Sequence, residues 1–320
     1  MGEYFSLVDV YLIPTLELLP TLTYFRGVRI NPTNSYNLIA YASRIRSFPS
    51  YFPVKVDITH VEMEMWRTLA EKAHPAILCM TILQHRSIIC HLQSFIEFAD
   101  ELSRTNQGPK IIDPVKGSMG MQIKKFGKAC GRLIELMHEH AQMEERMVFP
   151  PLEDADKGVT NTVNGYHARD LPVTNGIRED VKALMTIEKG TSDFKDTLAA
   201  LILRLRSLQA YTTQHFQEEE QELLPLLAAA GLGNTQQEAL VITCVDLMEA
   251  THGHHLPYFL LGLQPHEMHQ YMLMMQKCSE GGQIFKRMMH TIQNADDEFE
   301  NVRKEIGERM LSFASAWEIY

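Results

Sequence analysis

A histidine–glutamate motif that occurs twice constrains the fold of this chain more than any other feature. One copy begins at His140 and the other at His215, and both follow the pattern HxxxEExxxxPxL. A leucine precedes each histidine at the same distance, at Leu133 and Leu208. Residues four apart on an α-helix share one face, so each copy places an imidazole beside a carboxylate. Two such helices that face each other would bring two histidines and two glutamates to one shared site.

Apolar residues recur at three- and four-residue spacing along most of the chain, which predicts an all-α protein. The alternation typical of strands is missing, and Gly-Pro, Asp-Pro and polar segments separate the helical patterns. We expect Pro172 to disturb the third helix. The predicted helices cover about 61–102, 118–148, 163–187 and 193–221, followed by about 235–252, 265–278 and 284–316.

Differences in composition and in hydrophobic periodicity divide the chain into three parts. Residues 1–60 mix prolines with apolar residues without periodicity, and we interpret them as an irregular N-terminal arm. Residues 61–232 hold both motif copies and form the predicted bundle domain. Residues 233–320 form a predicted helical C-terminal extension, whose helices are a candidate surface for a protein partner.

Composition narrows the classes of partner. The formal net charge is -10, which repels phosphate backbones and argues against nucleic acid. The five cysteines are scattered without a CxxC spacing, so we expect no disulfide framework and no thiolate zinc site.

The N-terminal segment predicts neither a signal peptide nor a membrane span, because acidic residues and prolines interrupt its apolar stretch. The opening MGxxxS matches a short myristoylation pattern, which we interpret as accidental because Glu3 follows the glycine and no polybasic stretch follows. We therefore expect a cytoplasmic protein, with the nucleus as the alternative.

The first and third helices should each add a histidine to the shared site. His167 is the histidine of the third helix. In the first helix His74 lies beside Pro75 and His91 is rotated away from His85, so His85 is our choice. The predicted metal site comprises His85, His140, Glu144, His167, His215 and Glu219.

Imidazole nitrogens and carboxylate oxygens without thiolate favour iron or manganese, and suit zinc less well. A carboxylate from each of two helices could bridge two metal ions in the core of a bundle. We expect two iron ions, with manganese or zinc as the weaker alternatives.

The order H…HxxxE…H…HxxxE resembles the haemerythrin-type HHE cation-binding domain, over about residues 70–230. The phrases Gln84-His85-Arg86 and Leu223-Leu224-Pro225 agree with this likeness. The resemblance implies an up-down four-helix bundle that holds a non-haem diiron centre. The oxygen carriers of that family have another histidine one turn along the third helix, where this chain has Leu171. This departure implies an additional open position on one iron, which argues against reversible oxygen carriage.

A second resemblance begins after the bundle. The segment from Leu256 through Glu267 is similar to the one that follows haemerythrin domains in plant iron-regulated proteins. Some of those proteins are ubiquitin ligases with zinc modules, but this chain lacks the cysteines such modules need, so ligase activity is not carried over.

Two sets of polar residues receive a plainer interpretation. We interpret Glu145, Glu218, Glu220 and Glu222 as a solvated helix face. The extension holds a cluster of histidines, and a cluster of this kind is more often an exposed helix end than a metal site. It comprises His252, His254, His255, His266 and His269.

The leading hypothesis is a metal-binding protein that binds or senses iron or oxygen, in iron homeostasis, rather than an enzyme. Oxygen or peroxide is its expected small ligand. The first alternative is a diiron oxidoreductase, either a ferroxidase or a peroxide-consuming enzyme. The second is a helical interaction module that holds no metal.

Overall fold

In the computed structural model the chain forms two units. The first comprises Met1–His74 and Gln264–Gln270, and the second comprises Pro75–Leu263 and Tyr271–Tyr320. The six predicted site residues all belong to the second unit. His74 and nearly all of the predicted N-terminal arm lie outside the described residues. The structure describes residues 75–105, 118–229, 233–278 and 282–306, together with Asn37, Ala40 and Tyr41.

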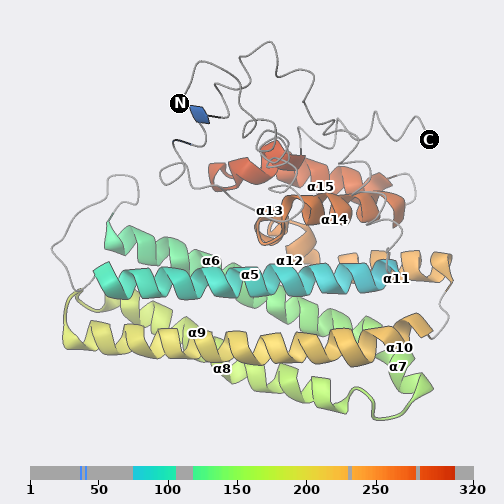
Figure 1. Ribbon diagram of the computed structural model, residues 1–320, viewed down its shortest axis with the longest axis horizontal. Coiled ribbons are helices and arrows are strands. Elements are labelled where there is room, and N and C mark those ends of the chain that lie inside the picture. Colours follow the sequence, from blue (N-terminus) through green and yellow to red (C-terminus); the bar gives the residue numbers. More distant parts are fainter. Residues whose placement is uncertain are drawn as a thin grey trace, which may run out of the picture. The chain divides into compact units, whose positions relative to one another are not determined.

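Four long helices form the bundle: α5 (Ala76–Thr105), α6 (Met119–Met143), α8 (Asn161–Thr186) and α9 (Ser192–Glu218). Helices α5 and α8 each pack against both α6 and α9, and each helix reverses the direction of the one before it (Figure 1). The described residues contain helices and turns but no strand. The predicted all-α, up-down bundle is therefore confirmed.

Local sequence signals set where the bundle helices begin. The Ser118 and Thr191 side chains accept hydrogen bonds from the backbone N–H of Met121 and Phe194, each at 3.3 Å. These caps satisfy N–H groups that have no partner inside the first turn. Both leucines upstream of the motif copies, Leu133 and Leu208, lie in the core.

The motif repeat is also a repeat of backbone structure. Helix α6 ends in a π-helical turn, η2 (Glu144–Val148), and α9 ends in η3 (Glu219–Leu223). The short helices α7 (Pro150–Ala155) and α10 (Leu224–Ala229) follow and pack against each other. Pro150 and Pro151 begin α7, since a residue without an N–H fits the first helical turn.

Pro172 does not interrupt the third helix, because α8 continues through it to Thr186. Proline removes a backbone hydrogen bond, which favours a kink in an isolated helix. Here α8 packs against both α6 and α9, and that packing holds the segment helical. The expected disturbance is therefore absent from the assigned helix.

The extension consists of short helices. Helix α13 was not predicted, because six residues are too few to show helical periodicity. The predicted closing helix is interrupted after α15, and residues 300–306 are helical again. The elements are α11 (Asn234–Leu247), α12 (Glu249–His252), α13 (Leu256–Leu261), α14 (Pro265–Cys278), α15 (Gln283–Gln293) and the 3-10 turn η5 (Asp297–Phe299).

Side chains of α5 attach helix α13 by hydrogen bonds to its backbone carbonyls. Ser87 Oγ donates to the Phe259 carbonyl at 2.7 Å, and His91 Nε2–H donates to the Tyr258 carbonyl at 2.9 Å. The His91 and Tyr258 rings stack with centroids 3.9 Å apart. His91 thus has a structural role in holding α13 against α5.

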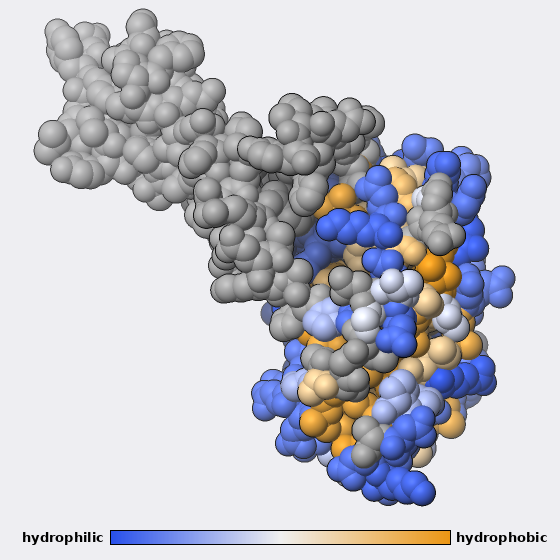
Figure 2. Space-filling view, turned by 90° about the vertical axis from the view of Figure 1, so that its right-hand side faces the viewer, coloured by the Kyte–Doolittle hydropathy of each residue, from blue (hydrophilic) through white to orange (hydrophobic). Residues whose placement is uncertain are grey.

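Among the described helices, none is both long and apolar enough to cross a membrane. The face shown in Figure 2 mixes hydrophilic and hydrophobic residues, with many hydrophilic ones along the margin of the described surface.

Gly262 permits the close approach of α13 to α5. A Cβ atom at this position would lie 2.8 Å from the Ser87 carbonyl oxygen, which is backbone and cannot turn away. We expect Gly262→Ala to lower the free energy of unfolding by about 1–3 kcal/mol. Urea unfolding measures the change. Gly131→Ala is the matched control, because a Cβ there meets nothing within 4 Å and alanine favours the helix. Equal stability of the two variants would contradict the prediction.

Candidate metal centre

The structure brings all six predicted site residues together from four helices. Five of them are at most 2% exposed, and the His167 side chain is 9% exposed. They are His85 on α5, His140 at the end of α6 with Glu144 at the start of η2, His167 on α8, and His215 on α9 with Glu219 at the start of η3. In each motif copy the first glutamate therefore lies at the point where the helix widens into a π turn.

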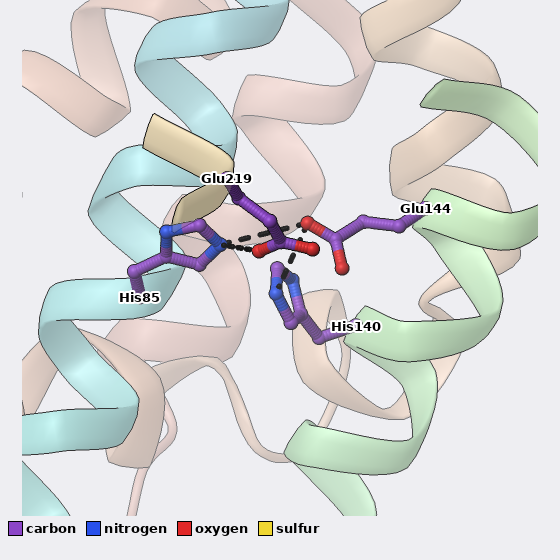
Figure 3. Close-up of side chains that lie close together, drawn as sticks. All are labelled: His85, His140, Glu144 and Glu219. Atoms are coloured by element: carbon purple, nitrogen blue, oxygen red, sulfur yellow. Dashed lines mark ion pairs between the residues drawn. The ribbon is translucent and has the colours of Figure 1, made fainter. Parts of the chain in front are cut away.

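Glu144 lies between histidines of three helices. Its Oε1 atom is 3.5 Å from His85 Nε2 and 3.3 Å from His140 Nε2. Its Oε2 atom is 3.4 Å from His167 Nε2. Figure 3 shows Glu144 and Glu219 pointing toward each other between His85 and His140. One carboxylate thus has imidazole nitrogens close to both of its oxygens.

Glu219 has a similar position. Its Oε1 atom accepts a hydrogen bond from His215 Nε2–H at 2.9 Å, and its Oε2 atom is 3.3 Å from His85 Nε2. The donor atoms form two groups, and within each group all atoms lie within 4.8 Å of one another. Because Glu219 belongs to both groups, the two candidate cation positions are adjacent. The groups are His85, His140, Glu144 and Glu219, and His167, His215 and Glu219.

Several inward-facing atoms are buried without a hydrogen-bond partner. They are Nε2 of His85, His140 and His167, both Glu144 oxygens, and Glu219 Oε2. Burying charged groups that remain unsatisfied costs several kcal/mol. A cation between these nitrogens and oxygens would satisfy all of them, so the donor set fits a bound metal.

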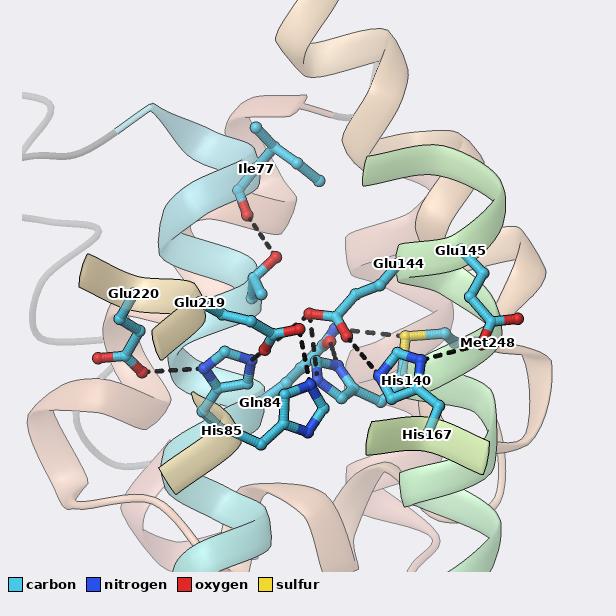
Figure 4. A network of polar contacts seen from close by, with 12 residues as sticks. Ile77, Gln84, His85, His140, Glu144, Glu145, His167, Glu219, Glu220 and Met248 are labelled. Carbon is cyan, nitrogen blue, oxygen red and sulfur yellow. Dashed lines mark hydrogen bonds and ion pairs between the residues drawn. The ribbon is translucent and has the colours of Figure 1, made fainter. Parts of the chain in front are cut away.

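The second glutamate of each motif copy holds the histidine of a neighbouring helix. His85 Nδ1–H donates to Glu220 Oε1 at 2.9 Å, and His167 Nδ1–H donates to Glu145 Oε1 at 2.9 Å (Figure 4). These bonds leave Nε2 of each ring free to face the centre. Our interpretation of Glu145 and Glu220 as a solvated face is therefore incomplete. The doubled glutamate in both copies was the signal that could have revealed this role.

The side-chain amide of Gln84 orients His140. Its Nδ1–H donates to Gln84 Oε1 at 2.8 Å, and Gln84 Nε2 donates to Met248 Sδ at 3.3 Å. Met248 lies between α11 and α12, so this chain of contacts joins the centre to the C-terminal extension (Figure 4).

Protonated histidines balance the negative charge of the buried carboxylates in this centre. Burial by itself would raise the pKa of Glu144, but its close electrostatic contacts with His140, His167 and His85 hold that pKa well below its usual value. Burial would lower the pKa of His167, but Glu144 and Glu145 raise it to about 9. Contacts with glutamates likewise overcome burial and raise the pKa of His85, whereas burial lowers the pKa of His140 to about 4. Protons on His85 and His167 therefore offset the ionised carboxylates when no metal is bound.

A cavity of about 450 Å³ reaches the centre, and His140, His167 and His215 contribute to its wall. Asp170 and Thr212 also line it, and the buried atoms Asp170 Oδ1 and Thr212 Oγ1 have no hydrogen-bond partner. Burial raises the pKa of Asp170. The cavity has room for a small molecule beside the metal-facing histidines.

His252 belongs to neither donor group of this centre in the part of the chain that the structure describes. His252 is buried, where its Nδ1–H donates to the Met248 carbonyl at 3.0 Å and its Nε2 accepts from the Tyr271 hydroxyl. Both ring nitrogens are thus used in packing the extension. His266 and His269 belong to the segment Gln264–Gln270 of the first unit.

Comparison with protein families identifies the domain that carries the centre. Residues 83–227 match the haemerythrin HHE cation binding domain. The resemblance inferred from the motifs is thereby confirmed for this haemerythrin domain, and all six site residues lie within it. Comparison with curated proteins and with solved structures finds no match. The likeness to plant iron-regulated proteins stays a prediction.

The haemerythrin domain should lose stability as pH rises when its centre holds no metal. The pKa of His167 is raised in the folded protein, so its contribution is fully present below about pH 6.5 and is lost as pH rises through about 9. We expect the free energy of unfolding in chelator to fall by about 1–3 kcal/mol across that range. Urea unfolding measures it. His167→Gln should flatten the dependence and exposed His138→Gln should not; an unchanged slope in the His167 variant refutes the assignment.

Removing the carboxylate behind a histidine should weaken metal binding. We expect Glu220→Ala and Glu145→Ala each to lower metal affinity by about 10- to 100-fold, because the imidazole loses its orientation and part of its basicity. Competition with a coloured chelator measures the affinity. Glu222→Ala is the control, since Glu222 is an exposed residue of the same π turn as Glu220. If all three variants bind as the wild type does, these hydrogen bonds do not support the centre.

Proposed function

We propose that this protein is a non-haem diiron protein of haemerythrin type that binds and senses iron or oxygen. The observation that carries the proposal is the pair of carboxylates placed between histidines, because Glu144 and Glu219 each extend toward both candidate cation positions. In this proposal the carboxylates of Glu144 and Glu219 would hold two iron ions between them. The four histidines His85, His140, His167 and His215 are terminal ligands.

The donor chemistry supports iron over the alternatives. The groups that converge are imidazole nitrogens and carboxylate oxygens, which suit iron or manganese better than zinc. No cysteine belongs to either group among the described residues. Two iron ions held there would supply electron-transfer chemistry and open coordination positions for oxygen or peroxide. The cavity beside His140, His167 and His215 gives such small ligands a route.

A sensing output is supported by the link between the centre and the extension. Gln84 holds His140 with its oxygen and contacts Met248 with its nitrogen. Helix α11 also packs against α5, α6 and η2, which carry three of the proposed ligands. Metal binding stabilises whichever conformation presents the ligands, so iron should order this part of the extension together with the centre.

The cavity also favours a second candidate function, a diiron oxidoreductase. Asp170 and Thr212 line the cavity, where their side-chain oxygens could hold a proton or orient a small substrate. A ferroxidase or a peroxide-consuming enzyme would use this pocket. Multiple turnover separates such an enzyme from a sensor, which reacts at most once per centre.

Metal analysis of protein purified without chelator tests the proposal. We expect about two iron ions per chain, together with near-ultraviolet absorption that changes on exposure to oxygen. Glu219→Ala should lose both ions, because the bridging group serves both positions, whereas the exposed control Glu222→Ala should keep them. Absence of iron, with no uptake by the metal-free protein, would refute the function. Repeated consumption of Fe(II) with oxygen or peroxide would replace the sensor with the oxidoreductase.

A further inference from the structure

A second group of metal-ligating side chains lies apart from the haemerythrin centre. Glu135 of α6 and the adjacent residues His254 and His255 offer one donor atom each, and these atoms lie within 4.8 Å of one another. His255 Nε2 is 2.8 Å from Glu135 Oε2, and the His254 and His255 ring centroids are 3.9 Å apart. Both histidines lie beyond residues 83–227, so they are not part of the family's own site.

The backbone that carries the two histidines is fastened to α6 by a neighbouring carboxylate. Glu139, one helical turn after Glu135, accepts hydrogen bonds from the backbone N–H of Ala250 at 2.9 Å and of Thr251 at 2.8 Å. The Thr251 hydroxyl donates to the same carboxylate at 2.6 Å. The first turn of α12 is therefore fixed against α6, which limits how far the following histidines can move from Glu135.

Gly253 makes the tight turn that returns the chain over α6. A Cβ atom at this position would lie 2.7 Å from the Glu249 carbonyl oxygen, so a larger residue would force the turn open. The His255 N–H closes the turn by donating to the Ala250 carbonyl at 2.9 Å. The sequence His-Gly-His-His is thus shaped to present His254 and His255 to the same side.

The three donors differ in accessibility in a way that suits an exchangeable ion. His255 is 7% exposed and anchored, while His254 and Glu135 are exposed to solvent. Two imidazoles and one carboxylate form a donor set typical of zinc sites and of other divalent transition-metal sites that keep an open position. A hydrogen bond between His255 and Glu135 alone would not explain why the exposed His254 also lies close to these two residues.

The group stands beside the cavity that leads to the haemerythrin centre. Glu135 and His138 line that cavity together with His140, His167 and His215. Along α6, Glu135 and His140 are separated by about 7.5 Å of helix axis. One carboxylate therefore borders both the surface group and the route to the proposed iron ligands.

We propose that Glu135, His254 and His255 bind a divalent transition-metal ion at the mouth of this cavity, and that the ion passes from there to the haemerythrin centre. The binding site stands on its own geometry. Its role as an entry site rests on the function proposed above.

Titration of the metal-free full-length chain with Zn²⁺ tests the binding site. We expect His254→Ala to lose one Zn²⁺ per chain relative to the wild type, because this exposed residue supplies one of three donors. His138→Ala is the matched control, an exposed histidine of the same cavity that lies outside the group. Calorimetry with metal analysis counts the ions.

The outcomes keep this proposal separate from the diiron function. An ion that is lost in the His254 variant supports the site even if the haemerythrin centre takes up no iron. Equal stoichiometry and affinity in the wild type and the His254 variant would overturn it, whether or not the centre binds metal.

The rate of iron loading tests the entry role. Stopped-flow absorption should show that the His254→Ala chain loads Fe(II) several-fold more slowly, while its final iron content at the centre equals that of the wild type. Equal loading rates in the two chains would overturn the entry role.

Discussion

The burial of two carboxylates among four imidazoles is the constraint on which the bundle depends. Glu144 and Glu219 are each 1% exposed, and buried carboxylates that lack partners cost several kcal/mol. Each is compensated by histidines of more than one helix, so the ionic contacts hold only when α5, α6, α8 and α9 align at this level. The packing of leucines stabilises many alignments of four amphipathic helices, whereas these pairs select one.

Both glutamates lie where an α-helix changes into a π turn. The i, i+4 spacing places Glu144 and Glu219 on the inward face, and the wider turn shifts the helical phase of the residues that follow, where Glu145 and Glu220 reach histidines on neighbouring helices. Rare π turns occur frequently at functional sites. Here the repeated distortion accompanies the repeated motif.

The C-terminal extension is attached to the same helices that present the metal donors. Gln84 and Ser87 of α5 bind the extension at Met248 and Phe259, and Glu139 of α6 holds the first turn of α12. A change at His85 or His140 is therefore one or two residues along the helix from a contact of the extension. This proximity gives the proposed sensor a physical route from metal occupancy to the surface.

The sequence by itself determined the helical class, the up-down bundle and the residues that meet at its centre. The helical class follows from local periodicity, the pairing of His140 with Glu144 and of His215 with Glu219 follows from i, i+4 geometry, and the up-down bundle is what the resemblance to the haemerythrin-type domain implied. Only the tertiary structure decided which nitrogen of His85 and His167 faces inward. Glu145 and Glu220 bind histidines of other helices, and sequence spacing does not reveal such partners. The same holds for the continuity of α8 through Pro172 and for the meeting of Glu135 with His254 and His255, since long-range packing and not local spacing brings those segments together.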